Sequence, residues 1–119
     1  MPFDEYNATV MDHFLNPRNT GELKDPTRVT TVKNEVCGDT LKLSVKIEGE
    51  RIVAARTKTF GCTAAIASAS ALTELLLGRT LSEARAIRDS DVVAFLGGLP
   101  PEKVKCSLVA EQAIRETLR

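Results

Sequence analysis

The strongest constraint on the fold is an alternating block in the middle of the chain. From residue 41 to residue 47, apolar side chains occupy every second position, which is typical of a strand with one buried face. Glu48-Gly49-Glu50 predicts a hairpin turn, and residues 52–60 predict the next strand. A β-branched run at residues 29–32 predicts a strand before both. The central region is therefore predicted to be a three-stranded antiparallel sheet.

The sequence on either side of these strands predicts helices. An apolar stripe over residues 3–15 predicts the first helix, which Asn16-Pro17 ends because proline disfavours helix at the residue before it. After the strands, helices are predicted over residues 63–77, from the Thr80 and Glu83 capping box, over residues 92–96, and from Pro100-Pro101 onward. Strands followed by helices indicate an α+β fold, with one sheet face covered by about five helices.

Length and composition narrow the class of protein. A chain of 119 residues is expected to form one domain over residues 1–119, and 43% hydrophobic with 27% charged residues is typical of soluble globular proteins. Sixteen basic residues balance sixteen acidic ones, and the aromatic residues are four Phe and one Tyr, so we expect no nucleic-acid partner. No stretch reads as a secretory signal or a membrane span, so we expect a cytoplasmic protein with no membrane partner.

The chain has three cysteines, Cys37, Cys62 and Cys106, and their odd number disfavours a disulfide framework. Each lies at a predicted junction: Cys37 in the turn with Asp39, Cys62 between a strand and a helix, and Cys106 in the first turns of the last helix. A thiolate is stabilised near a helix N-terminus. The intervals between the cysteines match no zinc finger, so only the fold could bring them together. On spacing alone, buried core cysteines are the better interpretation, with Asp39 as a turn residue.

Three thiolates and one carboxylate would nevertheless form a four-ligand set. Zinc accepts cysteine and carboxylate ligands in tetrahedral geometry, whereas iron–sulfur clusters normally take cysteine alone. Replacing one thiolate by a harder carboxylate oxygen should weaken the hold on a cluster. Such a site would suit a carrier whose cargo must leave.

Four motifs then carry a family resemblance. They are Met11-Asp12-His13-Phe14 with Asn16-Pro17-Arg18-Asn19 and Gly21; Cys37-Gly38-Asp39; Thr59-Phe60-Gly61-Cys62 with Ala65-Ile66-Ala67-Ser68 and Ser70; and Leu99-Pro100-Pro101 with Lys103, Cys106 and Ser107. In this order they resemble the IscU/NifU-N-terminal type of iron–sulfur cluster assembly scaffold over essentially the whole chain. The resemblance implies the IscU/SufE-like fold, and a scaffold or carrier rather than an enzyme.

The resemblance also implies roles for particular residues. Cys37, Asp39, Cys62 and Cys106 would hold a transient 2Fe–2S cluster, with Asp39 as the exchangeable ligand and Cys106 as the first sulfur acceptor. Zinc would bind the same site in the absence of a cluster. The implied partners are a cysteine desulfurase, iron and electron donors, and acceptor apoproteins or carriers. The chain would be a monomer or a cluster-bridged homo-oligomer.

Two positions depart from the family pattern. Lys105 stands where the family usually has a histidine, and a protonated lysine cannot ligate a metal, although its charge would favour the Cys106 thiolate. Lysine here is similar to the SufU branch, so a zinc-dependent sulfurtransferase is an alternative, which the absence of that branch's insertion disfavours. The segment Leu99-Pro100-Pro101-Glu102-Lys103 departs from the usual chaperone-binding motif at Glu102. The sequence therefore does not decide whether a DnaK-class chaperone binds this chain. A third class is a zinc-stabilised interaction module. His13, the sole histidine, is predicted to be structural.

Overall fold

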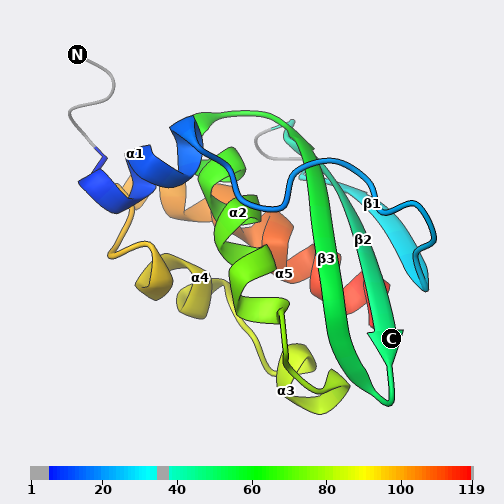
Figure 1. Cartoon of the computed structure of the whole chain (residues 1–119). Coiled ribbons are helices and arrows are strands. Elements are labelled where there is room, and N and C mark those ends of the chain that lie inside the picture. Colours follow the sequence, from blue (N-terminus) through cyan, green and yellow to red (C-terminus); the bar gives the residue numbers. More distant parts are fainter. Residues whose placement is uncertain (1–5, 35–37, 119) are drawn as a thin grey trace.

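The helices lie on one side of a three-stranded antiparallel sheet, as the computed structural model of residues 6–34 and 38–118 shows (Figure 1). The strands β1 (Arg28–Lys33), β2 (Thr40–Glu48) and β3 (Arg51–Phe60) are ordered β1-β2-β3. The helices are α1 (Ala8–Leu15), α2 (Thr63–Leu76), α3 (Leu81–Arg85), α4 (Asp89–Phe95), the 3-10 helix η2 (Pro101–Ser107) and α5 (Leu108–Thr117). These elements confirm the predicted α+β fold. Among the described residues, none of the helices is both long and apolar enough to cross a membrane.

The hairpin between β2 and β3 is tight and is followed by a bulge. Gly49 and Glu50 both have positive φ, at 57° and 65°, which suits a two-residue turn between antiparallel strands. The register then shifts, because Lys46 pairs with Ala54 whereas Ile47 pairs with Ile52. Val53 is the extra residue of this β-bulge, which lets both Ile52 and Ala55 face the core.

The core lies between the sheet and the two helices α2 and α5. Three of the four apolar side chains of β2 that the alternation placed inward, Leu41, Leu43 and Val45, are fully buried. The fourth, Ile47, lies where the register shifts and is only partly buried. All alanines and serines of α2 from position 64 to position 71 are buried, whereas Ile66 is partly exposed. This confirms that the stretch is a close-packed helix. α2 contacts α1, β3 and η2, so it lies at the centre of the packing.

The first helix is shorter than predicted. α1 begins at Ala8, because the Asn7 side chain caps it by accepting the N–H of Val10 at 2.8 Å. The same side chain donates to the carbonyl of Leu96 at 3.0 Å, which ties the start of α1 to the end of α4. Residues 1–5, where the prediction began the helix, lie outside the described residues.

The C-terminal half differs from the prediction at two places. The prediction of one continuous helix after Pro100-Pro101 was wrong: residues 101–107 form the 3-10 helix η2, and the α-helix begins at Leu108. Ser107 donates its hydroxyl to the carbonyl of Val104 at 2.6 Å within this tighter turn. α4 begins at Asp89, earlier than predicted, because the Asp91 carboxylate accepts the N–H of Arg88 at 2.8 Å.

The predicted capping box of α3 is confirmed. Glu83 Oε1 accepts the N–H of Thr80 at 2.9 Å, and Thr80 Oγ1 accepts the N–H of Glu83 at 3.2 Å. These reciprocal bonds satisfy two backbone donors at the helix start. The short helix therefore begins where the local sequence placed it.

The loop after α1 is fastened to α2 and β3. Its Asn19 carbonyl accepts the N–H of Thr57 at 3.0 Å, and Gly21 donates to the Thr57 carbonyl at 2.9 Å, so the loop covers part of the free edge of β3. Ser70 Oγ accepts the N–H of Arg18 at 2.9 Å and lies 2.7 Å from Nδ1 of His13. His13 is 5% exposed within this network, which agrees with a structural role.

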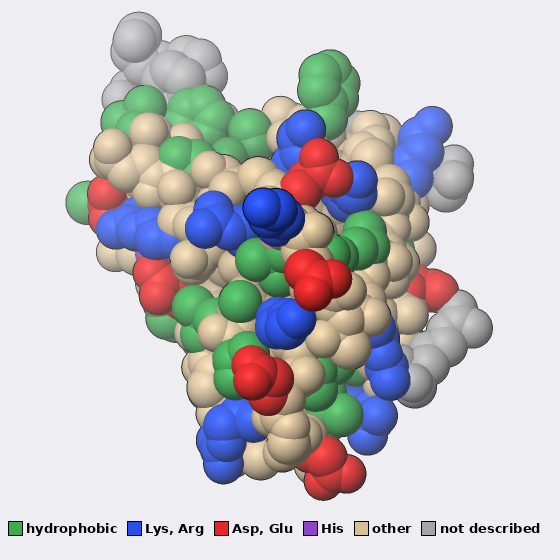
Figure 2. All heavy atoms as spheres, turned by 45° about the vertical axis from the view of Figure 1, so that its right-hand side comes forward, with side chains coloured by type: hydrophobic (Ala, Val, Ile, Leu, Met, Phe, Trp, Pro, Cys, Tyr) green, Lys and Arg blue, Asp and Glu red, His purple; other side chains and the backbone are tan. Residues whose placement is uncertain are grey.

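Charged side chains of both signs are interspersed on the face that Figure 2 shows. Glu22 pairs with Lys42 and lies 3.6 Å from Lys58, while Lys46 lies 3.6 Å from Asp25. Each of these three lysines therefore has an acidic partner.

Candidate metal centre

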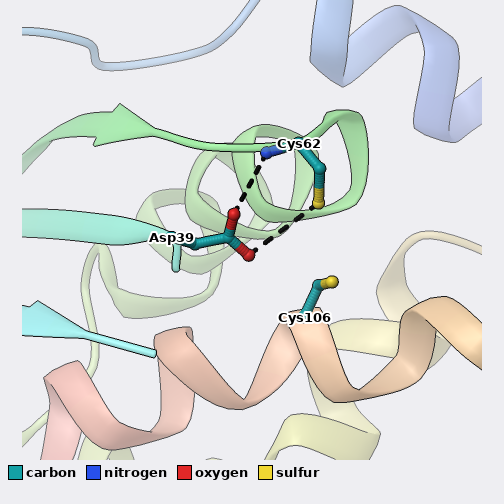
Figure 3. Close-up of side chains that lie close together, drawn as sticks. All are labelled: Asp39, Cys62 and Cys106. Atoms are coloured by element: carbon teal, nitrogen blue, oxygen red, sulfur yellow. Dashed lines mark hydrogen bonds between the residues drawn. The ribbon is translucent and has the colours of Figure 1, made fainter. Parts of the chain in front are cut away.

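Three segments that are distant in sequence bring one ligand-type side chain each to a common point (Figure 3). Asp39 directly precedes β2, Cys62 is the N-cap residue of α2, and Cys106 lies in η2. One carboxylate oxygen and the two sulfurs all lie within 4.8 Å of one another. The fold thus converges three of the four residues named as candidate ligands. The fourth, Cys37, lies outside the described residues.

The carboxylate of Asp39 is buried, and its two oxygens contact different atoms of Cys62. Asp39 is 3% exposed. Oδ1 accepts the backbone N–H of Cys62 at 3.2 Å, and Oδ2 lies 3.8 Å from the sulfur of Cys62. A carboxylate beside the first N–H groups of a helix is stabilised by the helix dipole. One oxygen is therefore held by the protein while the other faces the sulfurs.

Gly61 makes room for this arrangement. A Cβ atom at position 61 would lie 2.8 Å from Cγ and 2.9 Å from Cβ of Asp39, closer than non-bonded atoms approach. Any side chain at this position would push the Asp39 carboxylate away from the start of α2. Gly61 belongs to the motif Thr59-Phe60-Gly61-Cys62, but nothing in that motif indicates this clearance.

The two thiols differ in exposure. Cys106 is 2% exposed, whereas Cys62 is partly exposed. Cys62 and Asp39 line a surface hollow of about 540 Å³ together with Gly38, Phe60 and Ile66. A metal or a partner group can therefore approach from the side of Cys62, and Cys106 is the less accessible sulfur.

The donor set fits a thiophilic cation. Two thiolates and a carboxylate at these separations would repel one another, and a bound cation removes that repulsion. With zinc bonds of about 2.3 Å to sulfur and about 2.1 Å to oxygen, a tetrahedron has a sulfur–oxygen edge of about 3.6 Å. The separation of 3.8 Å between Cys62 Sγ and Asp39 Oδ2 is close to that edge.

Lys105 and Asn34 lie near the site, and a hydrogen bond joins them. Lys105, the residue directly before the third cysteine, has an exposed side chain. Its backbone carbonyl accepts a hydrogen bond from the side chain of Asn34 at 3.1 Å. Asn34 could not be identified from the sequence, because nothing in the local sequence signals a contact with a residue 71 positions away.

Comparison with solved structures places the fold in a known class. The chain superposes with a TM-score of 0.82 on the crystal structure of FiSufU from the thermophile Fervidobacterium islandicum AW-1, covering 100% of both chains at 22% sequence identity. That protein is described as a candidate iron–sulfur cluster assembly scaffold of the SUF system. At this identity the match establishes the shared fold.

Comparison of sequences then gives the family. The family model of the NifU-like N-terminal domain matches residues 5–119. The chain is 44% identical over 113 residues to iron–sulfur cluster assembly scaffold protein IscU 1 of Archaeoglobus fulgidus, covering 95% of this chain and 74% of the relative. It is 42% identical over 117 residues to the scaffold protein IscU of Escherichia coli K12, covering 95% and 91%. The chain therefore belongs to the NifU-like N-terminal domain family, which confirms the resemblance found in its motifs.

Proposed function

We propose that this protein assembles 2Fe–2S clusters from iron and desulfurase-derived sulfur and then passes them to acceptor apoproteins. The observation that carries the proposal is the convergence of Asp39, Cys62 and Cys106 within 4.8 Å in a chain whose relatives are named iron–sulfur cluster assembly scaffold proteins. In this proposal the cluster is the cargo of a carrier, and the protein has no turnover chemistry of its own.

The ligands we assign to the cluster are Cys37, Asp39, Cys62 and Cys106. Cysteine thiolates are the usual ligands of such clusters, and the carboxylate of Asp39 is the harder and weaker one. Asp39 can leave the metal without losing every partner, because its Oδ1 already accepts the N–H of Cys62. This alternative partner supports a role for Asp39 as the exchangeable ligand.

The sulfur step we assign is a transfer to Cys106. Its thiolate attacks the terminal sulfur of the desulfurase persulfide; a sulfur–sulfur bond forms on Cys106, the desulfurase bond breaks, and the desulfurase cysteine leaves as a thiolate. Because Cys106 is 2% exposed, η2 must shift to admit the donor. Lys105 is exposed beside it, and its charge favours the thiolate. Reducing the transferred sulfur to sulfide then requires an electron donor.

One observation favours a second candidate, a SufU-like zinc-dependent sulfurtransferase. Lys105 occupies the position before the third cysteine, as in the SufU branch. A protonated lysine cannot ligate zinc, so Asp39 would be the ligand beside the cysteines. Such a protein would accept sulfur on a cysteine and pass it on without retaining iron. The two candidates share the site and the desulfurase partner, and they differ in cargo.

The test is an anaerobic assembly followed by transfer. The protein is incubated with ferrous iron, a cysteine desulfurase, cysteine and a reductant, and apo-ferredoxin is then added with an iron chelator. We expect the visible absorbance of a 2Fe–2S cluster on the protein, followed by its appearance in ferredoxin. Persulfide on the protein without retained iron would contradict the scaffold function and support the sulfurtransferase.

A further inference from the structure

We infer that Asn34 is a positioning residue that holds Cys106 at the site of Asp39 and Cys62. Asn34 directly follows β1 and is 7% exposed. Its Nδ2 donates to the backbone carbonyl of Lys105 at 3.1 Å, across 71 positions of the chain. This inference rests on the metal site of the proposed function and adds a residue that does not itself touch the metal.

The backbone of Asn34 holds the segment that carries Asp39. Its N–H donates to the carbonyl of Asp39 at 2.7 Å, and its carbonyl accepts the N–H of Gly38 at 2.7 Å. Gly38 has φ 73°, a conformation that glycine adopts without strain. Asn34 thus binds the Asp39 segment through its backbone and the Cys106 segment through its side chain.

The bond to Lys105 acts on Cys106 through the peptide plane. The Lys105 carbonyl and the N–H of Cys106 belong to one peptide group, which is planar. Fixing the direction of that carbonyl therefore fixes the position of the Cys106 Cα and narrows where its sulfur can lie. The carbonyl also accepts the N–H of Leu108 within the helical segment, and its second bond, from Asn34, joins η2 to the Asp39 segment.

Loss of this bond should release η2. A 3-10 helix has poorer hydrogen-bond geometry than an α-helix, so η2 depends more on outside contacts. Without the amide of Asn34, the Cys106 sulfur should spend less time within reach of Asp39 and Cys62. The same release would expose the Cys106 sulfur, so Asn34 sets the balance between metal binding and access to this thiol.

The test compares Asn34→Asp and Asn34→Ala with a matched control. Aspartate has nearly the shape of asparagine but cannot donate to the Lys105 carbonyl, and alanine removes the side chain without adding charge. The control is Asn19→Asp, because Asn19 is also a partly buried amide donor, bonded to Thr73 Oγ1 at 3.1 Å away from the site. A general loss of stability would appear in all three variants.

Two readouts report on the position of Cys106. The first is the rate at which a maleimide labels Cys106 in the metal-free protein, resolved by peptide mass spectrometry; both Asn34 variants should react at least several-fold faster than the wild type and Asn19→Asp. The second is cobalt binding, where we expect about tenfold weaker affinity and reduced thiolate-to-cobalt charge-transfer absorption. Equal labelling rates in the Asn34 variants and in Asn19→Asp would overturn the inference.

The two readouts also separate this inference from the proposed function. Labelling needs no metal, so it decides the role of Asn34 whatever the site binds. If the wild type showed no thiolate-to-cobalt absorption, the proposed metal site would be wrong. Faster labelling of the Asn34 variants would still support the role of Asn34 in holding η2. If the wild type bound cobalt and Asn34→Ala matched it in spectrum and labelling, the role of Asn34 would fail alone.

Discussion

The backbone N–H of Cys62 and the carboxylate of Asp39 are joined at 3.2 Å, while the other oxygen of that carboxylate lies 3.8 Å from the Cys62 sulfur. One side chain therefore accepts a backbone N–H at the start of α2 and lies beside metal-ligand atoms at the same time. When metal leaves, the hydrogen bond from the Cys62 N–H to the Asp39 carboxylate remains. This double use links the stability of the metal-free protein to the strength with which it holds its cargo.

Asp39→Ala should separate the two roles of that side chain. We expect the cluster in this variant to last longer and to transfer more slowly than in the wild type. The carboxylate is the most weakly bound ligand, so it is the one that water or an acceptor protein displaces first, and the variant lacks it. The metal-free variant should also be about 1 kcal/mol less stable, because the N–H of Cys62 loses its acceptor. The measurements are the decay of visible absorbance and thermal unfolding.

Asp39→Asn is the matched control for this variant. It retains an oxygen that can accept the N–H of Cys62, so the metal-free stability should largely return, while the charged ligand is still absent. Faster loss of the cluster in Asp39→Ala than in the wild type would contradict the role of Asp39 as the exchangeable ligand.

Gly61→Ala should act on the same carboxylate from the other side. The added Cβ would meet Asp39, so we expect weaker zinc affinity, by about tenfold, in a competition with a chelator. The control is the same substitution in an Asp39→Gly background, where the atoms that would clash are absent. If Gly61→Ala reduced affinity equally in both backgrounds, its effect would not come through Asp39.

Local chemistry made much of the fold predictable. The sheet could be predicted from alternation and a turn, and α3 from a capping box whose two residues are three positions apart. The 3-10 character of η2 could not, because Pro100-Pro101 opens either kind of helix. The contact between Asn34 and Lys105 depends on tertiary packing, as does the clearance that Gly61 provides, and neither leaves a local pattern.

The candidate site was predictable in its residue types but not in its geometry. The residue types at Cys62, Cys106 and Asp39 suggested a ligand set, yet spacing alone favoured buried core cysteines. Their convergence follows from the packing of η2 against α2, which no local interval encodes. The exposure difference between the two sulfurs likewise appears only once the helices are packed.

His13 should make stability depend on pH. Burial lowers the pKa of His13 below its usual value near 6.5; the Arg18 charge adds to this, and Asp12 and Glu74 oppose it. The folded state then binds fewer protons than the unfolded state, so stability is fully present above about pH 6.5 and falls as pH drops through the unfolded value toward the lower folded value. The measurement is urea unfolding between about pH 7 and pH 5.

His13→Gln provides the comparison for this pH dependence. Since His13 is the only histidine in the chain, the variant should show a flatter profile over the same range, from a lower starting stability. An unchanged slope in His13→Gln would assign the pH dependence to other groups.

Lys105→Ala should leave metal binding intact and slow sulfur acceptance. Its side chain is exposed, and a protonated lysine is not a ligand, so metal content should stay near that of the wild type. Persulfide formation on Cys106 with a cysteine desulfurase should be slower, because the nearby positive charge that favours the thiolate is gone. Mass spectrometry of the persulfide and metal analysis of the same sample test both parts.

Lys105→Arg is the control, because it keeps the charge and should retain the rate of sulfur acceptance. A loss of metal in Lys105→Ala would mean that Lys105 supports the site directly, and the assignment of Asp39 as the carboxylate ligand would then fail.

The most direct test of the central claim is iron and acid-labile sulfide analysis after anaerobic reconstitution of the wild type and of three single variants, Cys37→Ser, Cys62→Ser and Cys106→Ser. Hydroxyl is a poor substitute for thiolate at neutral pH, so each variant should lose most of the bound iron. We predict nearly equal amounts of iron and sulfide on the wild type and a sharp loss on each variant. A wild type that takes up neither iron nor sulfide, or serine variants that bind both as the wild type does, would contradict a cluster scaffold built on these cysteines.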